Sequence, residues 1–228
     1  MPPTRPEMPA EPLFWGKRRL PVPWAASWSG ERVAVSGDLV ARPDGTGLAY
    51  RDETADDRDR YGVLWARLAG SPGNGRPAFG TLHSGRQRHA MLRRLCQVCG
   101  GPADRTSRGW LFLLPHSGHP AGEPPGRTEG ALSTKPPVCR PCADLAARHC
   151  PHLTGAIAVR CRGPRVWGVF GGLCVPAPGG RLVSPTDGYL PYGHPATPWF
   201  LASQLVIRLT RCTRTSLTAE GLGRTGDG

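Results

Sequence analysis

The chain has almost no lysine and no long apolar run. Lys17 and Lys135 are its two lysines, so 27 of its 29 basic residues are arginine. No apolar stretch reaches the roughly 18 residues that span a bilayer, so no membrane partner is expected. The first thirty residues contain no continuous apolar segment followed by a small-residue cleavage site. We therefore expect no secretory signal and a cytoplasmic protein.

Aromatic residues are also scarce, at 7 %, whereas a quarter of the 228 residues are glycine or proline. That composition excludes a long, regular helical bundle and is typical of loop-rich chains. Hydrophobic residues, at 39 %, still suffice for a core, which excludes wholesale disorder. The sequence therefore predicts one folded domain with appendages, made of short elements and many turns.

The net charge of +12 favours polyanionic partners, above all DNA or RNA, because it attracts them at long range. The shortage of lysine, together with abundant glycine, proline and alanine, indicates a codon bias toward high GC content. The number of arginines is therefore weak evidence by itself. Their position along the chain matters more.

The densest basic cluster falls on a helix predicted over residues 85–95. Ser84 and Gln87 match the Ser-x-x-Gln capping box at its start, and Met91, Leu92 and Leu95 would point inward. The predicted nucleic-acid contacts are the four arginines of this helix, Arg86, Arg88, Arg93 and Arg94. The alternative is a solvated, charged helix face with no ligand.

We expect an α+β fold with short antiparallel strands and three helices. The predicted segments are an irregular Pro-rich arm (1–30), a short-strand region (31–84), an Arg-rich helix with a zinc finger (85–153), a β-hairpin with a C-terminal amphipathic helix (154–212) and a disordered tail (213–228). The second helix is predicted over 139–149. The third would start at Thr197 and Pro198 and place Leu201, Leu205, Leu209 and Cys212 on one stripe.

Four of the eight cysteines form two C-x-x-C pairs: Cys96, Cys99, Cys139 and Cys142. Without a secretory signal, a disulfide framework is not expected, because the cytosol keeps thiols reduced. Zinc prefers four tetrahedral thiolate or imidazole ligands, and each C-x-x-C turn supplies two. We therefore predict one structural Zn²⁺ held by these four cysteines, and no other small-molecule cofactor.

The remaining cysteines have apolar neighbours or lie near histidines. Cys161, Cys174 and Cys212 are predicted as core residues. Cys150 lies between His149 and His152, so a fifth ligand or a second metal site involving these three residues stays open.

The residues around the paired cysteines resemble a known finger. Cys96-Gln-Val-Cys99-Gly100 resembles a zinc knuckle, and the second pair opens a predicted helix, where amides and the helix dipole favour thiolates. This order resembles a treble-clef zinc finger over about residues 95–153. More widely, Val63-Leu-Trp65, CQVCG, CRPCADLAARHCPHL and VWGVFGG resemble uncharacterised actinobacterial proteins over about residues 48–212. That resemblance implies a shared fold and no known activity.

The 39 residues between Cys99 and Cys139 also resemble the spacing in HNH endonucleases, which carry catalytic and metal-binding groups on a treble clef. That family implies a histidine after an acidic residue, but here His116 follows Pro115. It implies a metal-binding histidine just after the second pair, but here the residue is Ala143. The asparagine expected before that pair is missing too. The sequence thus shows neither a general base that would activate water nor a group that would bind a metal ion at the phosphate.

The sequence predicts a non-enzymatic zinc-binding protein, acting as a nucleic-acid-associated or regulatory binding module. His116 and His119 are then loop or packing residues. Two alternatives stay open: a protein–protein interaction scaffold with a structural zinc, and a divergent HNH-like endonuclease.

Overall fold

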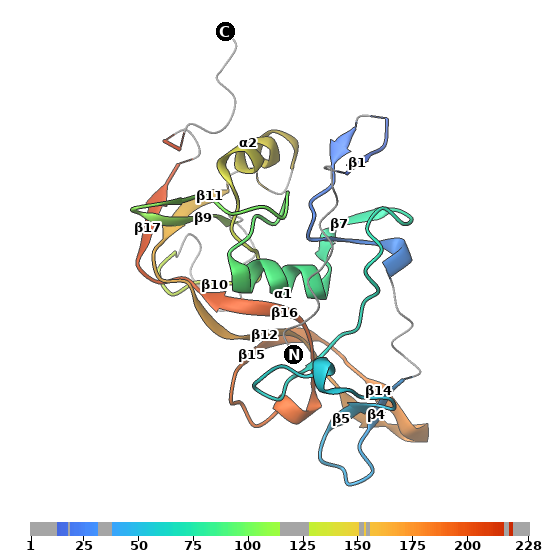
Figure 1. Cartoon of the computed structure of the whole chain (residues 1–228). Coiled ribbons are helices and arrows are strands. Elements are labelled where there is room, and N and C mark those ends of the chain that lie inside the picture. The colour runs from blue at the N-terminus through green and yellow to red at the C-terminus, as the bar shows by residue number, and fades with distance from the viewer. Residues whose placement is uncertain are drawn as a thin grey trace.

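The computed structural model describes residues 13–17, 19–31, 38–114, 128–150, 153, 156–216 and 219–220. Its two α-helices are α1 (Ser84–Arg93) and α2 (Arg140–His149) (Figure 1). The strands are β1 (Phe14–Trp15), β2 (Leu20–Pro21), β3 (Ala26–Trp28), β4 (Leu39–Ala41), β5 (Leu48–Tyr50), β6 (Leu64–Trp65), β7 (Pro77–Leu82), β8 (Arg105–Thr106), β9 (Gly109–Leu114), β10 (Leu132–Ser133), β11 (Ile157–Cys161), β12 (Arg165–Leu173), β13 (Val175–Ala177), β14 (Arg181–Val183), β15 (Asp187–Pro191), β16 (Phe200–Arg208) and β17 (Cys212–Thr215).

Two sheets form the centre of the molecule. The first sheet has the order β17-β11-β9-β8, with every pair antiparallel. The second has the order β10-β16-β12-β15, also antiparallel, and β6 joins β16 in parallel. Short two-stranded pairs, β1-β2, β3-β7, β4-β5 and β13-β14, surround them.

The main core lies between these two sheets, and α1 contributes to it. Phe112 and Val159 of the first sheet pack with Leu205 and Ile207 of the second, and Met91 of α1 joins them. All five are buried, and burial of their apolar surface stabilises the fold. Helix α2 covers the other face of the first sheet (Figure 1).

The two sheets are joined at one corner, where two connections run side by side. The chain passes from β11 to β12 through residues 162–164, and from β16 to β17 through residues 209–211. The N–H of Arg162 donates to the carbonyl of Arg211 (3.2 Å), and that of Gly163 donates to the carbonyl of Thr210 (2.9 Å). The corner, residues 162–165 and 208–211, is therefore one hydrogen-bonded unit.

The predicted α+β fold with three helices is wrong, because the described chain is mostly β with two helices. The stretch predicted as the C-terminal amphipathic helix is the long strand β16. It is hydrogen-bonded to β12 on one side and to β10 and β6 on the other, and Val206 and Ile207 are fully buried. Strand pairing with distant segments outweighs the weak helical spacing of the leucines.

The predicted disordered tail is also wrong where the structure describes it. β17 extends to Thr215 and pairs with β11, and Glu220 is buried. The helices predicted at 85–95 and 139–149 are confirmed as α1 and α2. The two strands predicted around Gly163-Pro164 are present as β11 and β12, but the predicted hairpin is wrong, because β11 pairs with β9 and β17 whereas β12 pairs with β15 and β16 in the other sheet. Of the predicted arm, residues 1–12 lie outside the described residues. Its described part includes β1, β2 and β3, with Trp24 and Trp28 buried.

Candidate metal centre and basic surface

The structure brings the four paired cysteines together. The Sγ atoms of Cys96, Cys99, Cys139 and Cys142 all lie within 4.8 Å of one another, and those of Cys99 and Cys139 are 3.8 Å apart. Four sulfurs at ~2.3 Å from a tetrahedral ion lie about 3.8 Å apart. The cluster therefore has the size of a metal-thiolate site, and these four cysteines could hold a metal ion.

A tight backbone turn presents the first pair. The N–H of Cys96 donates to the carbonyl of Gly101 (2.7 Å), and the N–H of Gly100 donates back to the carbonyl of Cys96 (2.8 Å). Gly100 has φ +73°, a left-handed conformation that favours glycine. The N–H of Gln97 donates to the carbonyl of Pro137 (3.1 Å), which ties the turn to the segment before the second pair.

The first turn of α2 presents the second pair. Cys139 is the N-cap residue, Pro141 occupies the first turn, and Cys142 follows on the same turn. Proline is suited to this position because the first helical N–H groups have no partner within the helix. The exposed amides and the helix dipole stabilise thiolates here.

Contacts among the thiols shift their pKa values in opposite directions. The contact with Cys96 lowers the pKa of Cys139 to about 7, and the contact with Cys142 lowers the pKa of Cys99. The pKa of Cys96 is raised by its contact with Cys139. Packed thiols thus share protons, and a bound cation would replace those protons, because the thiolate is the metal ligand.

The segments that carry the four cysteines pack against the first sheet. Cys96, Val138 and Ala143 form an apolar cluster with Leu111 of β9 and Ala158 of β11. The N–H of Val138 donates to the carbonyl of Leu111 (2.9 Å). Loss of the finger would therefore disturb β9 and β11 as well.

The remaining cysteines lie outside this cluster, and within the described residues no other group of three or more Cys, His, Asp or Glu has metal-site spacing. Cys150 caps the C-terminus of α2, next to the exposed His149. Cys161, Cys174 and Cys212 pack in or against apolar clusters, as predicted. His116, His119 and His152 lie outside the described residues.

Arg86 was predicted as a nucleic-acid contact, but the structure buries it. Its side chain is 2 % exposed and forms a two-pronged ion pair with Glu31, with Nη1–Oε1 2.6 Å and Nη2–Oε2 2.8 Å. Arg86 also donates to the carbonyl of Ala26 (2.6 Å), and Glu31 accepts from the N–H groups of Trp28 and Ser71. This arginine joins α1 to the N-terminal segment and is not part of a surface.

The other three arginines of α1 do not form one face. Arg88 is half-buried with its guanidinium 4.5 Å from the centre of the Trp65 ring. Arg94 ends the helix in a left-handed conformation and donates to the carbonyls of Met91 and Pro164. Arg93 is exposed. Leu92, predicted to point inward, is also exposed.

The corner carries a basic surface that the sequence analysis missed. Arg162, Arg165, Arg208 and Arg211 are all exposed, and we call these four residues the corner arginines. Arg165 and Arg208 are direct partners on the antiparallel strands β12 and β16, so their side chains share one face. The guanidinium of Arg208 lies 5.8 Å from the centre of the Trp167 ring. The sequence contains two Arg-x-x-Arg stretches, 162–165 and 208–211, that could have indicated this surface. Because residues 198–212 were predicted as a helix, the two stretches were not expected to lie side by side.

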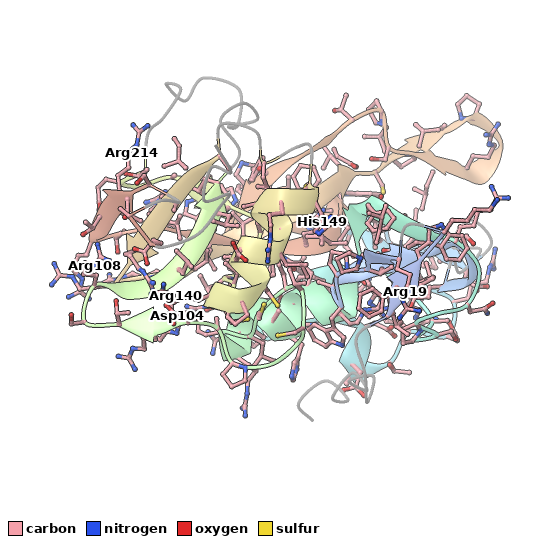
Figure 2. The ribbon with its side chains drawn as sticks, turned by 90° about the horizontal axis from the view of Figure 1, so that it is seen from above. Arg19, Asp104, Arg108, Arg140, His149 and Arg214 are labelled. Atoms are coloured by element: carbon pink, nitrogen blue, oxygen red, sulfur yellow. The ribbon has the colours of Figure 1, made fainter. Side chains whose placement is uncertain are left out.

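More arginines surround the corner. Trp110 of β9 pairs with Cys161, just before Arg162, and the guanidinium of Arg105 lies 4.5 Å from its ring centre. Figure 2 shows Arg108 and Arg214 on the same side of the molecule. Arg105, Arg108 and Arg214, which lie on the first sheet or its β8–β9 turn, are all exposed.

Comparisons with protein-family models, with curated proteins and with solved structures find no match to the chain. In the described part of the chain, neither helix has the length and apolar character to cross a membrane.

Proposed function

We propose that this protein is a non-enzymatic, zinc-stabilised module that binds nucleic acid through the corner arginines. The observation that carries the proposal is the direct pairing of Arg165 with Arg208 across two strands. Like charges placed opposite each other destabilise a sheet. Neither side chain forms an ion pair with any described residue, so the fold itself does not compensate this repulsion.

Phosphate groups would relieve that repulsion, because each one brings a negative charge to the surface. The tryptophans support nucleic acid over other polyanions. Trp167 and Trp110 are half-buried; Trp167 lies against the corner arginine Arg208, and Trp110 lies against Arg105 of β8. Aromatic rings beside arginines give bases a surface for stacking, which favours single-stranded DNA or RNA.

Zinc is the ion that suits the donor set of the finger. Four thiolates in a tetrahedral cluster are typical ligands of structural zinc, and they leave no open position for water or phosphate. The turn at Cys96–Gly100, the hairpin β8–β9 and helix α2 follow one another in the order of a treble clef, which supports placing the finger in that class. The ion would then stabilise the first sheet, whose strand β11 leads into the corner.

The nuclease alternative lacks support at the second C-x-x-C pair. Ala143, where the resemblance to HNH enzymes implies a metal-binding histidine, is fully buried in the apolar cluster of the finger.

A protein partner is the second candidate, and the β13–β14 hairpin favours it. Val175 and Val183 are direct cross-strand partners and both are exposed, next to the exposed Leu173. Exposed apolar side chains grouped on one hairpin are common at protein interfaces. Such a partner would bind away from the corner and would not depend on its arginines.

Binding of labelled oligonucleotides across a salt series tests the proposed function. A single-stranded 20-mer, its duplex and the matching RNA are compared by fluorescence anisotropy. For a single strand, each phosphate contact contributes a slope of about 0.7 in log K against log salt. Arg165→Ser with Arg208→Ser should weaken binding and lower that slope by about 1.4.

The matched control is Arg76→Ser with Arg181→Ser, which removes the same charge from exposed positions away from the corner. The control should keep most of the affinity. No binding at low salt, or equal losses in both double variants, would refute the role of the corner.

A further inference from the structure

Glu220 is a carboxylate buried among arginines from three parts of the fold. Its Oε2 lies 2.6 Å from Nη2 of Arg160, and its Oε1 lies 3.2 Å from Nε of Arg160 and 2.9 Å from Nη2 of Arg108. Arg140, in the first turn of α2, donates to the backbone carbonyl of Glu220 (2.5 Å). Arg160 is fully buried, and the side chain of Glu220 is 2 % exposed. A strand, a turn and a helix thus converge on one acidic residue.

The chain holds Glu220 in this place through a short turn. The N–H of Glu220 donates to the carbonyl of Ser216 (3.1 Å), and the N–H of Ala219 donates to the hydroxyl of Ser216 (2.9 Å). Local hydrogen bonds to Ser216 therefore position Glu220.

The arginines at this site outnumber its carboxylates. Asp104 also pairs with Arg160, so Arg160 and Arg108 face the two carboxylates of Asp104 and Glu220, while Arg140 contacts the backbone carbonyl of Glu220. Figure 2 shows Arg140 and Asp104 close together, with Arg108 farther out on the same side of the molecule. One positive charge remains with Glu220 in place, and two remain without its carboxylate. Such a site suits an oxoanion that accepts several charge-assisted hydrogen bonds.

This site is open to solvent at Arg108, and the β8–β9 turn next to Arg108 contacts the start of the corner. The Arg108 side chain is 49 % exposed, so a ligand in solvent can contact this arginine. Arg162, one of the corner arginines, follows the last residue of β11 and is two residues after Arg160. Gly109, with φ +107°, brings the β8–β9 turn so close to Cys161 and Arg162 that a Cβ there would overlap the carbonyl of Cys161.

We propose that Arg160, Arg108 and Arg140 form a phosphate-binding site, and that Glu220 fills it as a competing carboxylate of the same chain. The site deepens the function proposed above and rests on it for the identity of the ligand, a backbone phosphate of nucleic acid. A nucleic acid bound at the corner would reach this site only after Glu220 leaves. The apparent affinity is then reduced by the fraction of molecules in which Glu220 is out.

Inorganic phosphate is the first probe, measured by thermal shift at constant ionic strength on the full chain. Glu220→Ala removes the carboxylate from Arg160 and Arg108, while Arg160 keeps its partner Asp104 and the backbone carbonyl that Arg140 contacts stays. Its affinity for phosphate should rise by at least about fivefold over that of the wild type. Adding Arg108→Ala should remove this gain. Asp187→Ala, an exposed acid away from the site, is the control for net charge and should show no gain.

Ser216→Ala keeps every charge and removes the hydroxyl that accepts the N–H of Ala219, so it tests the proposal even if Glu220→Ala does not fold. Ser216→Ala should also raise the affinity for phosphate, by a smaller factor than Glu220→Ala. Unchanged affinity in a folded Glu220→Ala protein, an equal gain in Asp187→Ala, or no gain in Ser216→Ala when Glu220→Ala is unfolded would overturn the proposal.

A labelled single-stranded 20-mer is the second probe and separates this site from the proposed function. If phosphate affinity rises but no variant binds the oligonucleotide, the anion site stands and the nucleic-acid function fails. If the wild type binds the oligonucleotide and Glu220→Ala changes neither affinity, the function stands and the competition by Glu220 is wrong.

Discussion

Arg165 and Arg208 lie directly opposite each other on β12 and β16, with their side chains on one exposed face of the second sheet. A like-charged pair at this position destabilises the sheet, whereas threonine is favoured in strands. Arg165→Thr should therefore raise the free energy of unfolding by about 0.5 kcal/mol and at the same time weaken oligonucleotide binding. Urea denaturation measures the first effect and anisotropy the second.

Arg181→Thr, in the exposed strand β14, is the matched control. It should leave both the free energy of unfolding and the affinity for the oligonucleotide nearly unchanged. A gain in stability together with a loss of binding is typical of a surface that serves a ligand. If Arg165→Thr lowers stability and leaves binding intact, the pair has a structural role instead.

The buried pair of Arg86 and Glu31 gives a second prediction. Arg86→Met leaves Glu31 as a buried charge without its cation, so the free energy of unfolding should fall by about 3–5 kcal/mol. Arg86→Met with Glu31→Gln should recover part of this loss, because the remaining amide is neutral. Arg93→Met, at an exposed position of the same helix, should change stability by less than about 0.5 kcal/mol. A loss from Arg86→Met no larger than that from Arg93→Met would contradict the pairing.

Acid stability should depend on Asp57. Arg67, at 2.7 and 2.6 Å from its two carboxylate oxygens, lowers the pKa of Asp57 from 3.8 to about 2. Because the folded-state pKa is the lower one, this contribution is complete above pH 3.8 and is lost as the pH falls toward 2. Asp57→Asn should cost roughly 1–2 kcal/mol at neutral pH, after allowance for solvent screening.

The difference between wild type and Asp57→Asn should then shrink between about pH 4 and pH 2 in chemical denaturation. Asp52→Asn is the control, since Asp52 also pairs with Arg67 but is 74 % exposed. A difference between wild type and Asp57→Asn that stays constant over this pH range would refute the assignment to Asp57.

Local signals in the sequence predicted the parts that depend on local structure. The two C-x-x-C pairs, the turn at Gly100 and the proline in the first turn of α2 each act within a few residues, and the cluster of four cysteines follows from them. Helix α1 was predicted correctly, but not its start. His83 is the N-cap, and Gln87 hydrogen-bonds with the backbone of Leu205 instead of closing a capping box.

The missed parts depend on residues far apart in the chain. The sequence around Arg86 is typical of an exposed arginine on a helix. Only the fold brings Glu31, 55 residues away, next to it. β16 becomes a strand because it pairs with β12, β10 and β6, and no spacing within Phe200–Arg208 encodes those partners. The corner arginines came together only when this strand was in place.

Native mass spectrometry of the purified protein, with a parallel thermal melt, tests the central claim that the four-cysteine finger holds a stabilising zinc ion. Apparent zinc-binding free energies of about 10–16 kcal/mol in small zinc peptides match or exceed the stability of a typical domain. We expect one zinc per chain in the wild type and in Cys150→Ser, whose cysteine lies outside the cluster. Cys142→Ser should lose the ion and melt at a lower temperature. A metal-free wild-type protein whose melting temperature does not change in chelator would contradict the account.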